Sequence, residues 1–219
     1  MRPQVNIDQY YLDSYDSKER FISYWNQINE IRKFKHGSIL EIGIGNGFVR
    51  NYFRERKVNL TTLDIDEKLD PDIIGKVTDL PFKDGSFDLI ACFEVLEHIP
   101  YEKFTKALCE IFRTTRNNAV ISIPDSRSVY RIYIHIPFVT IIRKLIPLPG
   151  IKKPVHIFDG EHYWEIGKRG YPLSRIKKDI KGSGFKIVRT YSLFEHPYHR
   201  FFILKKDLDK QNHQYDQRT

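Results

Sequence analysis

The sequence predicts one α/β domain over residues 1–219, with a doubly wound, Rossmann-like fold. We expect a mostly parallel seven-stranded sheet with an antiparallel final strand. Three observations predict this fold: short apolar strand patterns alternate with helical patterns, a glycine-rich turn follows the first strand, and only residues 191–199 separate the last two strands. Alternating strands and helices form parallel βαβ units, whereas short connections join antiparallel neighbours.

The first elements belong to an N-terminal helical segment, residues 1–36, and to the first βα unit. Apolar residues at helical spacing predict an amphipathic helix over residues 14–33. Residues 38–42 form a short apolar strand that runs directly into the glycine turn at 43–47, and residues 48–56 resume a helical pattern. This order is strand, turn, helix.

The central strands follow at residues 59–65, at 73–77 with a weak pattern, and at 87–93. The strand at 87–93 is almost continuously apolar, as expected for a strand buried on both faces. Residues 101–115 then predict a helix, and residues 119–123 predict the fifth strand.

The C-terminal elements are a helix at residues 173–181 and strands at 185–190 and 200–205, which we expect to pair as an antiparallel hairpin. Residues 211–219 are expected to form a disordered tail.

Residues 125–172 are too long for an ordinary connection, because loops in α/β units usually take about 2–6 residues. They predict an insertion or lid within the domain. Two alternatives remain for its apolar stretch: one or two helices packed on the core, or a cap over a hydrophobic or lipid-linked acceptor, with peripheral membrane contact through basic residues. These residues are Arg131, Arg143, Lys144, Lys152 and Lys153.

The composition, with 41% hydrophobic and 29% charged residues, is that of a globular protein. Two cysteines, Cys92 and Cys109, exclude a disulfide framework, and both lie in apolar patterns that predict burial. We expect no signal peptide, no membrane-spanning helix and a cytoplasmic location.

The formal net charge is +8, and basic residues outnumber acidic ones between residues 127 and 206. Nucleic acid, anionic lipid or a phosphorylated small molecule could match this charge, and a plain solvated surface is the fourth alternative.

The glycine turn carries the first functional signal. Its pattern is Glu41-x-Gly43-x-Gly45-x-Gly47. A dinucleotide fingerprint would need glycine where Phe48 stands, and no Gly-Lys-Ser/Thr follows, so neither a nicotinamide site nor a phosphate-binding P-loop is expected.

A carboxylate follows the second strand. Asp64 ends that strand, and its two oxygens can accept both hydroxyls of a ribose. Asp66 is a weaker candidate for this role, and a helix-capping or turn role for Asp64 is the structural alternative.

Two further segments complete a pattern. Residues 78–88 read TDLPFKDGSFD and residues 93–99 read FEVLEHI. With the glycine turn and Asp64, they resemble in order the motifs of the class I S-adenosylmethionine-dependent methyltransferases, specifically the type 11-like family. The resemblance covers residues 38–124 closely, and it implies S-adenosylmethionine as the cofactor.

The resemblance also implies roles for individual residues. The acidic residue at the position of Asp79 would face the adenine amino group, and the backbone of Leu80 would complete the contact with the base. A turn-forming role is the alternative for Asp79. Phe93 and Glu94 would border the methionine and ribose portions. The implied cofactor-binding residues are Glu41, Gly43, Gly45, Asn46, Gly47, Asp64, Ile65, Asp79, Leu80, Phe93 and Glu94.

The methyl group of this cofactor is already activated, so the protein must mainly position an acceptor. If the acceptor is a hydroxyl, a base can remove its proton, and His98, His162 and Tyr163 are the candidates. A structural role is the alternative for His98. No His/Cys cluster has zinc spacing, so no metal is expected.

The sequence therefore predicts a methyltransferase acting on a small-molecule, glycan or lipid-linked acceptor, at an oxygen. An RNA methyltransferase and a non-catalytic cofactor-binding relative are the alternatives. The Asn/Asp-Pro-Pro-Tyr/Phe motif of enzymes that methylate base amino groups is absent after Phe93, and no RNA-binding module is recognised. Nucleic acid is therefore the less favoured partner.

Overall fold

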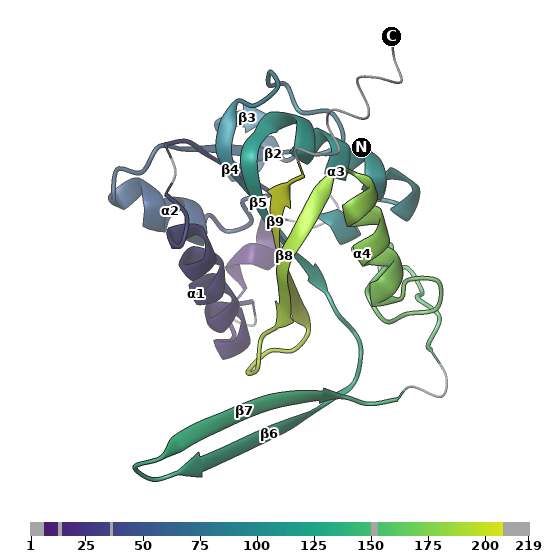
Figure 1. Cartoon of the computed structure of the whole chain (residues 1–219). Coiled ribbons are helices and arrows are strands. Elements are labelled where there is room, and N and C mark those ends of the chain that lie inside the picture. The colour runs from purple at the N-terminus through teal and green to yellow at the C-terminus, as the bar shows by residue number, and fades with distance from the viewer. Residues whose placement is uncertain (1–6, 13–14, 36, 150–152, 208–219) are drawn as a thin grey trace.

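The computed structural model describes residues 7–12, 15–35, 37–149 and 153–207. Its main sheet has seven strands in the order β3-β2-β1-β4-β5-β9-β8 (Figure 1), and only β9 runs antiparallel to its neighbours. The predicted fold class and the final antiparallel pairing are confirmed. The strands are β1 (Ile39–Ile42), β2 (Leu60–Asp64), β3 (Ile73–Ile74), β4 (Phe87–Phe93), β5 (Thr115–Pro124), β8 (Phe185–Ser192) and β9 (His199–Lys206).

Helices cover both faces of this sheet (Figure 1). Side chains alternate along a strand, so neighbouring residues of β1 face opposite layers. Ile39 packs with residues of α1 and α2 in one hydrophobic cluster, whereas Leu40 packs with residues of α3 and α4 in another. The helices are α1 (Lys18–Arg32), α2 (Phe48–Glu55), α3 (Phe104–Thr114) and α4 (Leu173–Gly182), with short 3-10 turns η1 (Ile7–Tyr11), η2 (Glu67–Leu69), η3 (Leu96–His98) and η4 (Tyr101–Lys103).

The strand order reverses beside β1. The chain runs from β1 outward to β2 and β3, then returns so that β4 pairs with the other side of β1. In open α/β sheets a ligand binds at such a switch point, beyond the carboxyl ends of the strands. The topology thus places the glycine turn after β1 and the segment after β4 side by side.

The apolar part of the insertion forms strands, where one alternative had predicted helices. Strands β6 (Val129–Ile136) and β7 (Thr140–Pro147) pair as an antiparallel hairpin outside the main sheet, and the hairpin projects from the domain (Figure 1). The stretch is rich in β-branched and aromatic residues, which favour strands. Pro137 interrupts any helix, and Phe138 turns the chain with a φ of +62°.

The structure also bears on the expectations for the cysteines and for membrane-spanning helices. Cys92 is buried as predicted, but Cys109 is exposed, because it lies on the outward side of α3. None of the helices in the described ranges has the length and apolar character that crossing a bilayer requires. Lys152 and the predicted tail at 211–219 lie outside the described residues.

Candidate functional site

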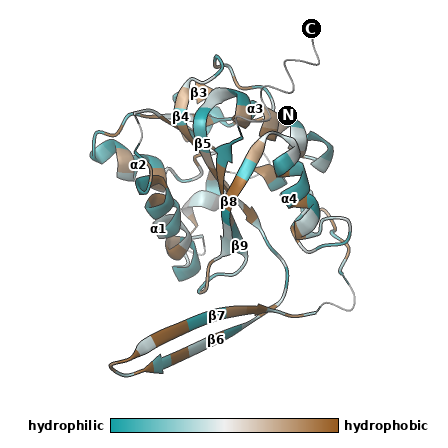
Figure 2. Ribbon diagram, in the orientation of Figure 1, coloured by the Kyte–Doolittle hydropathy of each residue, from teal (hydrophilic) through white to brown (hydrophobic). Residues whose placement is uncertain are grey.

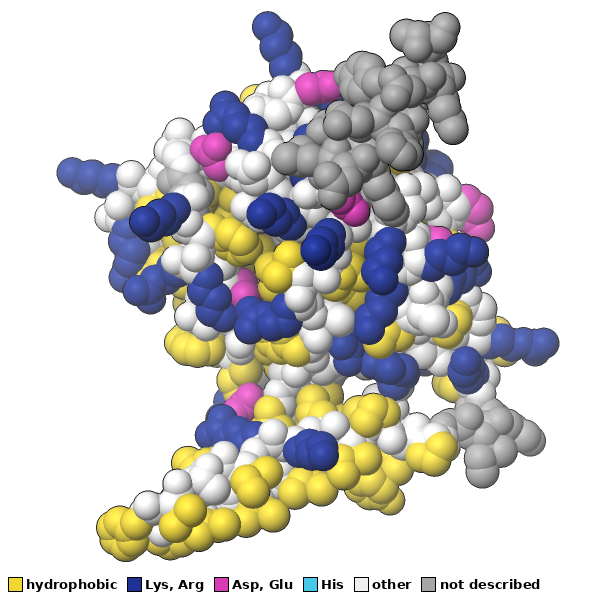
Figure 3. All heavy atoms as spheres, viewed as in Figure 1, with side chains coloured by type: hydrophobic (Ala, Val, Ile, Leu, Met, Phe, Trp, Pro, Cys, Tyr) yellow, Lys and Arg dark blue, Asp and Glu magenta, His cyan; other side chains and the backbone are white. Residues whose placement is uncertain are grey.

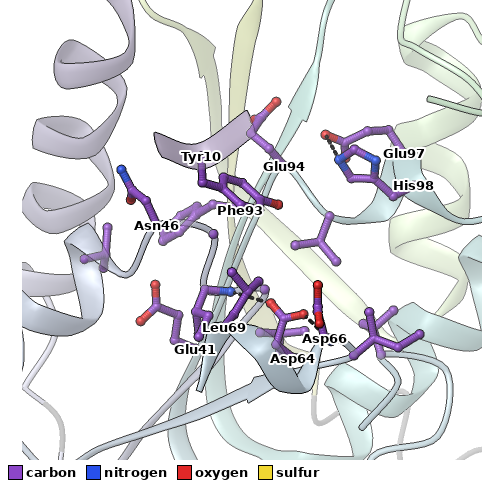
Figure 4. A pocket seen from close by; sticks show the side chains of 18 of the residues that line it. Tyr10, Glu41, Asn46, Asp64, Asp66, Leu69, Phe93, Glu94, Glu97 and His98 are labelled. Carbon is purple, nitrogen blue, oxygen red and sulfur yellow. Dashed lines mark hydrogen bonds and ion pairs between the residues drawn. The ribbon is translucent and has the colours of Figure 1, made fainter. Parts of the chain in front are cut away.

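A cavity of about 510 Å³ opens at the carboxyl ends of β1, β2 and β4 (Figure 4). This volume is within the usual range of about 300–1,000 Å³ for small-molecule sites. Its walls come from the glycine turn, the end of β2, residues 75–78, the segment after β4, the N-terminal residues, the end of the insertion and the loop before β9.

The glycine turn forms one wall with its backbone. Gly43 has a φ of +78°, and a Cβ there would lie 2.2 Å from the Cγ2 atom of Val95. No other residue fits this position without displacing Val95 or the turn, since L-residues rarely adopt this φ. Asn46, Gly45 and the backbone of Ile44 also line the cavity.

Asp64 lies at the end of β2 and is tied to this turn. Its carboxylate accepts hydrogen bonds from the backbone N–H of Ile44 and of Asp66, both at 2.9 Å (Figure 4). Burial raises the pKa of the Asp64 carboxyl, partly offset by these backbone donors. Each carboxylate oxygen has more than one lone pair, so both can still accept a hydroxyl from a ligand.

Glu41 is a second buried carboxyl in this part of the cavity. Its Oε2 atom has no hydrogen-bond partner among the described residues, and burial raises the pKa of the group to about 8. The rest of the lining is also rich in acids, including Asp66 and Glu161, whereas its cationic side chains are Arg20 and Lys76. A ligand that carries positive charge would favour the ionised form of these carboxyls.

The structure does not bring Asp79 and Leu80 into the cavity. Asp79 is exposed and absent from the lining. The Leu80 N–H donates to Glu110 Oε2 at 2.8 Å, and its carbonyl accepts from Arg113 at 2.9 Å. Because this pair of residues on α3 holds the loop, residues 75–78 face the cavity instead, and the expected contact of Asp79 and Leu80 with adenine is not supported.

Phe93 and Glu94 line the cavity where β4 ends. Glu94 has a φ of +52°, which is uncommon for a residue with a side chain and is typical of functional segments. Its Oε1 atom has no hydrogen-bond partner among the described residues, while Oε2 lies 3.5 Å from His199 Nε2. Burial raises the pKa of Glu94 to about 7.

The three candidate bases separate into two groups. His98 and His162 both line the cavity, and their ring centroids are 5.0 Å apart. Burial lowers the pKa of His98 to about 4, so it is neutral at pH 7. Tyr163 is not among the lining residues; it packs against the core, and its ring lies 4.7 Å from that of Phe158. This position does not support a role as the base.

The cavity also contains residues that sequence reasoning missed. Tyr10 and Tyr15 lie near the glycine turn, with ring centroids 5.2 Å apart, and the Arg20 guanidinium lies 4.3 Å from the Tyr15 ring. Glu97 comes from η3, adjacent to His98. Of these, only Glu97 had a sequence signal, since it belongs to the segment after β4. Lys76, Thr78, Tyr198 and His199 are further lining residues.

Comparison with known proteins gives the family. Residues 40–123 match a family model described as a methyltransferase domain. An uncharacterized protein of Methanocaldococcus jannaschii is 36% identical over 95 residues, which are 40% of this chain and 41% of that protein. The match thus spans less than half of this curated relative.

Solved structures give the same fold over most of the chain. The alignment with a protein from Pyrococcus horikoshii covers 90% of this chain and 95% of that protein, with a TM-score of 0.60 and 13% identity. The alignment with an S-adenosylmethionine-dependent methyltransferase from Clostridium acetobutylicum covers 90% of this chain and 96% of that enzyme, with a TM-score of 0.58 and 10% identity. The alignment with the 1,6-didemethyltoxoflavin-N1-methyltransferase of Burkholderia thailandensis, solved with S-adenosylhomocysteine, covers 91% of this chain and 84% of that enzyme, with a TM-score of 0.57 and 12% identity. Residues 40–123 therefore match the methyltransferase domain family, and the chain has the fold of the class I S-adenosylmethionine-dependent methyltransferases.

Proposed function

We propose that this protein transfers a methyl group from S-adenosylmethionine to an oxygen of a small-molecule, glycan or lipid-precursor acceptor. The observation that carries the proposal is the cavity itself. It joins the glycine turn, the Asp64 carboxylate and the residues after β4 around one acid-rich space. The family match over residues 40–123 supports the same activity.

The lining fits the cofactor part by part. Asp64 would accept the ribose hydroxyls, and the backbone of residues 43–47 would approach the cofactor closely because its glycines leave the space open. Residues 75–78, with Ile65, would contact the adenine in place of Asp79. Phe93 and Glu94 would border the methionine portion. The cofactor, when bound, supplies a methyl group activated on a sulfonium.

The remaining space belongs to the acceptor. His98, His162 and Glu97 line it, and Tyr198 also contributes aromatic surface. These residues would hold the acceptor oxygen in line with the methyl group and exclude water, and positioning of this kind contributes several kcal/mol to catalysis, up to about 11 kcal/mol in well-oriented intramolecular reactions.

The β6–β7 hairpin supports a lipid-linked acceptor. Within the described residues the hairpin contributes nothing to the cavity wall, which contains Glu161 and His162 from the rest of the insertion. Its side chains are mostly exposed, and apolar ones cover much of its length (Figures 2 and 3). Patches of this kind mark interaction sites. The large exposed apolar residues between the hairpin ends are Tyr130, Tyr133, Ile134, Ile136, Phe138, Val139, Ile141, Ile142 and Ile146.

Basic residues on the same hairpin complement an anionic membrane surface. Arg131, Arg143 and Lys144 are exposed beside these apolar side chains. An apolar surface with basic neighbours is the composition that binds at a lipid interface. We therefore propose that the hairpin contacts the membrane surface from which the acceptor is taken.

Calorimetry tests the cofactor part of the proposal. S-adenosylhomocysteine should bind the purified chain, and Asp64→Asn should weaken the binding about tenfold or more, because it removes a charged acceptor for the ribose hydroxyls. Asp79→Asn is the matched control and should bind like the wild type. No heat with either S-adenosylmethionine or S-adenosylhomocysteine would contradict the proposal. A screen with labelled S-adenosylmethionine over hydroxyl-bearing acceptors then identifies the substrate class, and transfer to RNA alone would favour the alternative.

Vesicle sedimentation tests the membrane contact. The wild type should pellet with vesicles containing anionic phospholipid and much less with neutral phosphatidylcholine vesicles. The variant Phe138→Asp/Ile141→Asp should stay in the supernatant. Val188→Asp, an exposed apolar position on β8, is the control and should pellet normally. Equal pelleting of the hairpin variant and the wild type would remove this part of the proposal.

A further inference from the structure

Three side chains of the types that bind metal ions lie together in the part of the cavity that we assign to the acceptor. Glu97, His98 and His162 each bring one ligand atom into a cluster in which all such atoms are within 4.8 Å of one another. Figure 4 shows the Glu97 carboxylate directed at the His98 ring, and their closest atoms, Oε1 and Nε2, are 3.9 Å apart. Glu97 and His98 are adjacent in η3, and His162 follows 64 positions after His98, in the insertion.

Glu97 is the unusual member of this cluster. It is fully buried, and neither of its carboxylate oxygens has a hydrogen-bond partner among the described residues. A buried carboxylate without a partner is costly, so such groups are normally paired, protonated or bound to a metal. Glu94 adds a third buried oxygen without a partner among the described residues, and it is close enough to interact electrostatically with Glu97 and His162.

The hydrogen bonds of the two histidines fix which nitrogen can bind a ligand. His98 Nδ1 lies 3.0 Å from the carbonyl oxygen of Glu161. A carbonyl only accepts, so Nδ1 carries the proton and Nε2 presents a lone pair to Glu97. An ionised Glu97 carboxylate would face this lone pair across 3.9 Å, with two electron-rich atoms opposite each other. A cation satisfies both.

His162 is oriented in the same way. Its Nδ1 atom lies 3.1 Å from the Glu165 carboxylate, which leaves Nε2 as its other ligand atom. The carboxylate in turn accepts a hydrogen bond from Tyr198 Oη. Metal-binding histidines usually donate their second N–H to a carboxylate or a backbone carbonyl, which fixes the ring and raises its basicity. The Glu165 carboxylate is this partner for His162, and the Glu161 carbonyl is this partner for His98.

The distances are compatible with one ion. Nitrogen and oxygen ligands lie about 2.0–2.2 Å from a metal such as zinc, so two ligands of one ion are about 3.4 Å apart in a tetrahedral site and at most about 4.3 Å apart on opposite sides of the ion. The 3.9 Å between Glu97 and His98 would shorten by about half an ångström to reach the tetrahedral spacing, and the 4.8 Å limit on the whole cluster means that His162 would move by at most about 1.4 Å.

We propose that Glu97, His98 and His162, with Glu94 beside them, bind one divalent transition-metal cation that holds the acceptor hydroxyl. Imidazole and carboxylate ligands together favour Mn²⁺, Fe²⁺ or Zn²⁺, and three or four protein ligands leave a position for a substrate oxygen. This inference rests on the proposed function and names its substrate class, an alcohol. The histidines then hold the ion rather than act as bases.

The reaction balances without a further reactant. A cation held by Glu97, His98 and His162 would make the proton of a bound hydroxyl more acidic. The hydroxyl oxygen forms the new bond to the methyl carbon, the carbon–sulfur bond breaks, and sulfur keeps its electron pair. The proton leaves to water. The products are a methyl ether and S-adenosylhomocysteine.

Electron paramagnetic resonance of Mn²⁺ and calorimetry with Zn²⁺ test the site on the full chain after treatment with a chelator. The wild type should bind one equivalent of Mn²⁺, displaced by Zn²⁺. Glu97→Gln and His162→Asn should each weaken binding about tenfold or more, as the loss of metal-site interactions does elsewhere. Asp159→Asn is the control: Asp159 lies with His162 and Glu165 in a neighbouring acidic group, and its loss should leave the affinity unchanged.

Binding of S-adenosylhomocysteine is measured on the same samples. It should be retained by the variants and by the metal-free protein, which shows that they are folded and separates this inference from the proposed function. A wild type that binds neither Mn²⁺ nor Zn²⁺, or both metal-site variants with unchanged affinity, would overturn the metal site. A loss confined to Asp159→Asn would place the ion in the neighbouring group and would also overturn it.

Discussion

The fit between Gly43 and Val95 makes a quantitative prediction about the glycine turn. A Cβ added at Gly43 would lie 2.2 Å from Val95 Cγ2, and the backbone there has a φ of +78°. Gly43→Ala therefore introduces two separate costs, a left-handed conformation and a steric clash. Val95→Ala removes the clashing methyl groups and leaves the backbone conformation unchanged.

The two costs have different sizes. A left-handed conformation costs a residue with a side chain about 1–2 kcal/mol. Overpacking of this kind costs about 1–3 kcal/mol. Gly43→Ala should thus lower the free energy of unfolding by about 2–5 kcal/mol. In the double variant the clash is absent, so Gly43→Ala should cost only about 1–2 kcal/mol relative to Val95→Ala.

Urea denaturation followed by circular dichroism measures all four proteins of this cycle. The account predicts a coupling energy of about 1–3 kcal/mol between the two positions. Calorimetry with S-adenosylhomocysteine on the folded variants should show the same order, because the turn forms the cavity wall. If the two substitutions were additive to within about 0.5 kcal/mol, the contact between Gly43 and Val95 would not limit the turn, and the reasoning would fail.

Three further predictions concern other parts of the molecule. Asp88 accepts hydrogen bonds from Arg116 and from the backbone before β1, and these lower its pKa from 3.8 to about 2. The stabilisation that Asp88 contributes is therefore present above pH 3.8 and should disappear as the pH falls toward 2. In Asp88→Asn, the melting temperature should depend less on pH in this acidic range. Trp164→Phe leaves the Ile99 carbonyl without its 3.1 Å donor in a buried position and should cost about 1–3 kcal/mol in urea denaturation, whereas unchanged stability would contradict the burial argument. Tyr10→Ala should weaken S-adenosylhomocysteine binding in calorimetry without changing the melting temperature of the ligand-free protein, since Tyr10 lines the cavity and lies outside both hydrophobic clusters.

The main sheet was predictable because its signals are local. The strand at 87–93 is apolar except for Asp88, and β4 has those bounds. The glycines of the turn were identified by type, and three of them have positive φ. The pairing of β8 with β9 followed from the short connection between them. In each case one stretch of chain contains the whole signal.

The positions of Asp79 and Tyr163 were not predictable, because they depend on distant contacts. Glu110 and Arg113, on α3, occupy the backbone of Leu80 and hold the loop that carries Asp79 away from the cavity. Tyr163 turns into the core while its neighbour His162 turns into the cavity. A motif gives residue types at a spacing; it does not give the direction of each side chain.

Of the two alternatives for the insertion, the one with helices was wrong for a different reason. Apolar residues interrupted by prolines are ambiguous between a helix and a strand when neither period dominates. The metal-ligand cluster was missed because a search for zinc spacing looks for ligands close in sequence, whereas His162 reaches Glu97 and His98 only through the fold. The expectation of no metal therefore rested on spacing alone.

A crystal structure of the chain with S-adenosylhomocysteine tests the central claim most directly. The account predicts the ribose hydroxyls within hydrogen-bond distance of the Asp64 carboxylate, the adenine against residues 75–78, and the sulfur atom directed toward Glu97 and His98. Density for the nucleoside outside this cavity, or an adenine ring held by Asp79 with Asp64 unengaged, would contradict it.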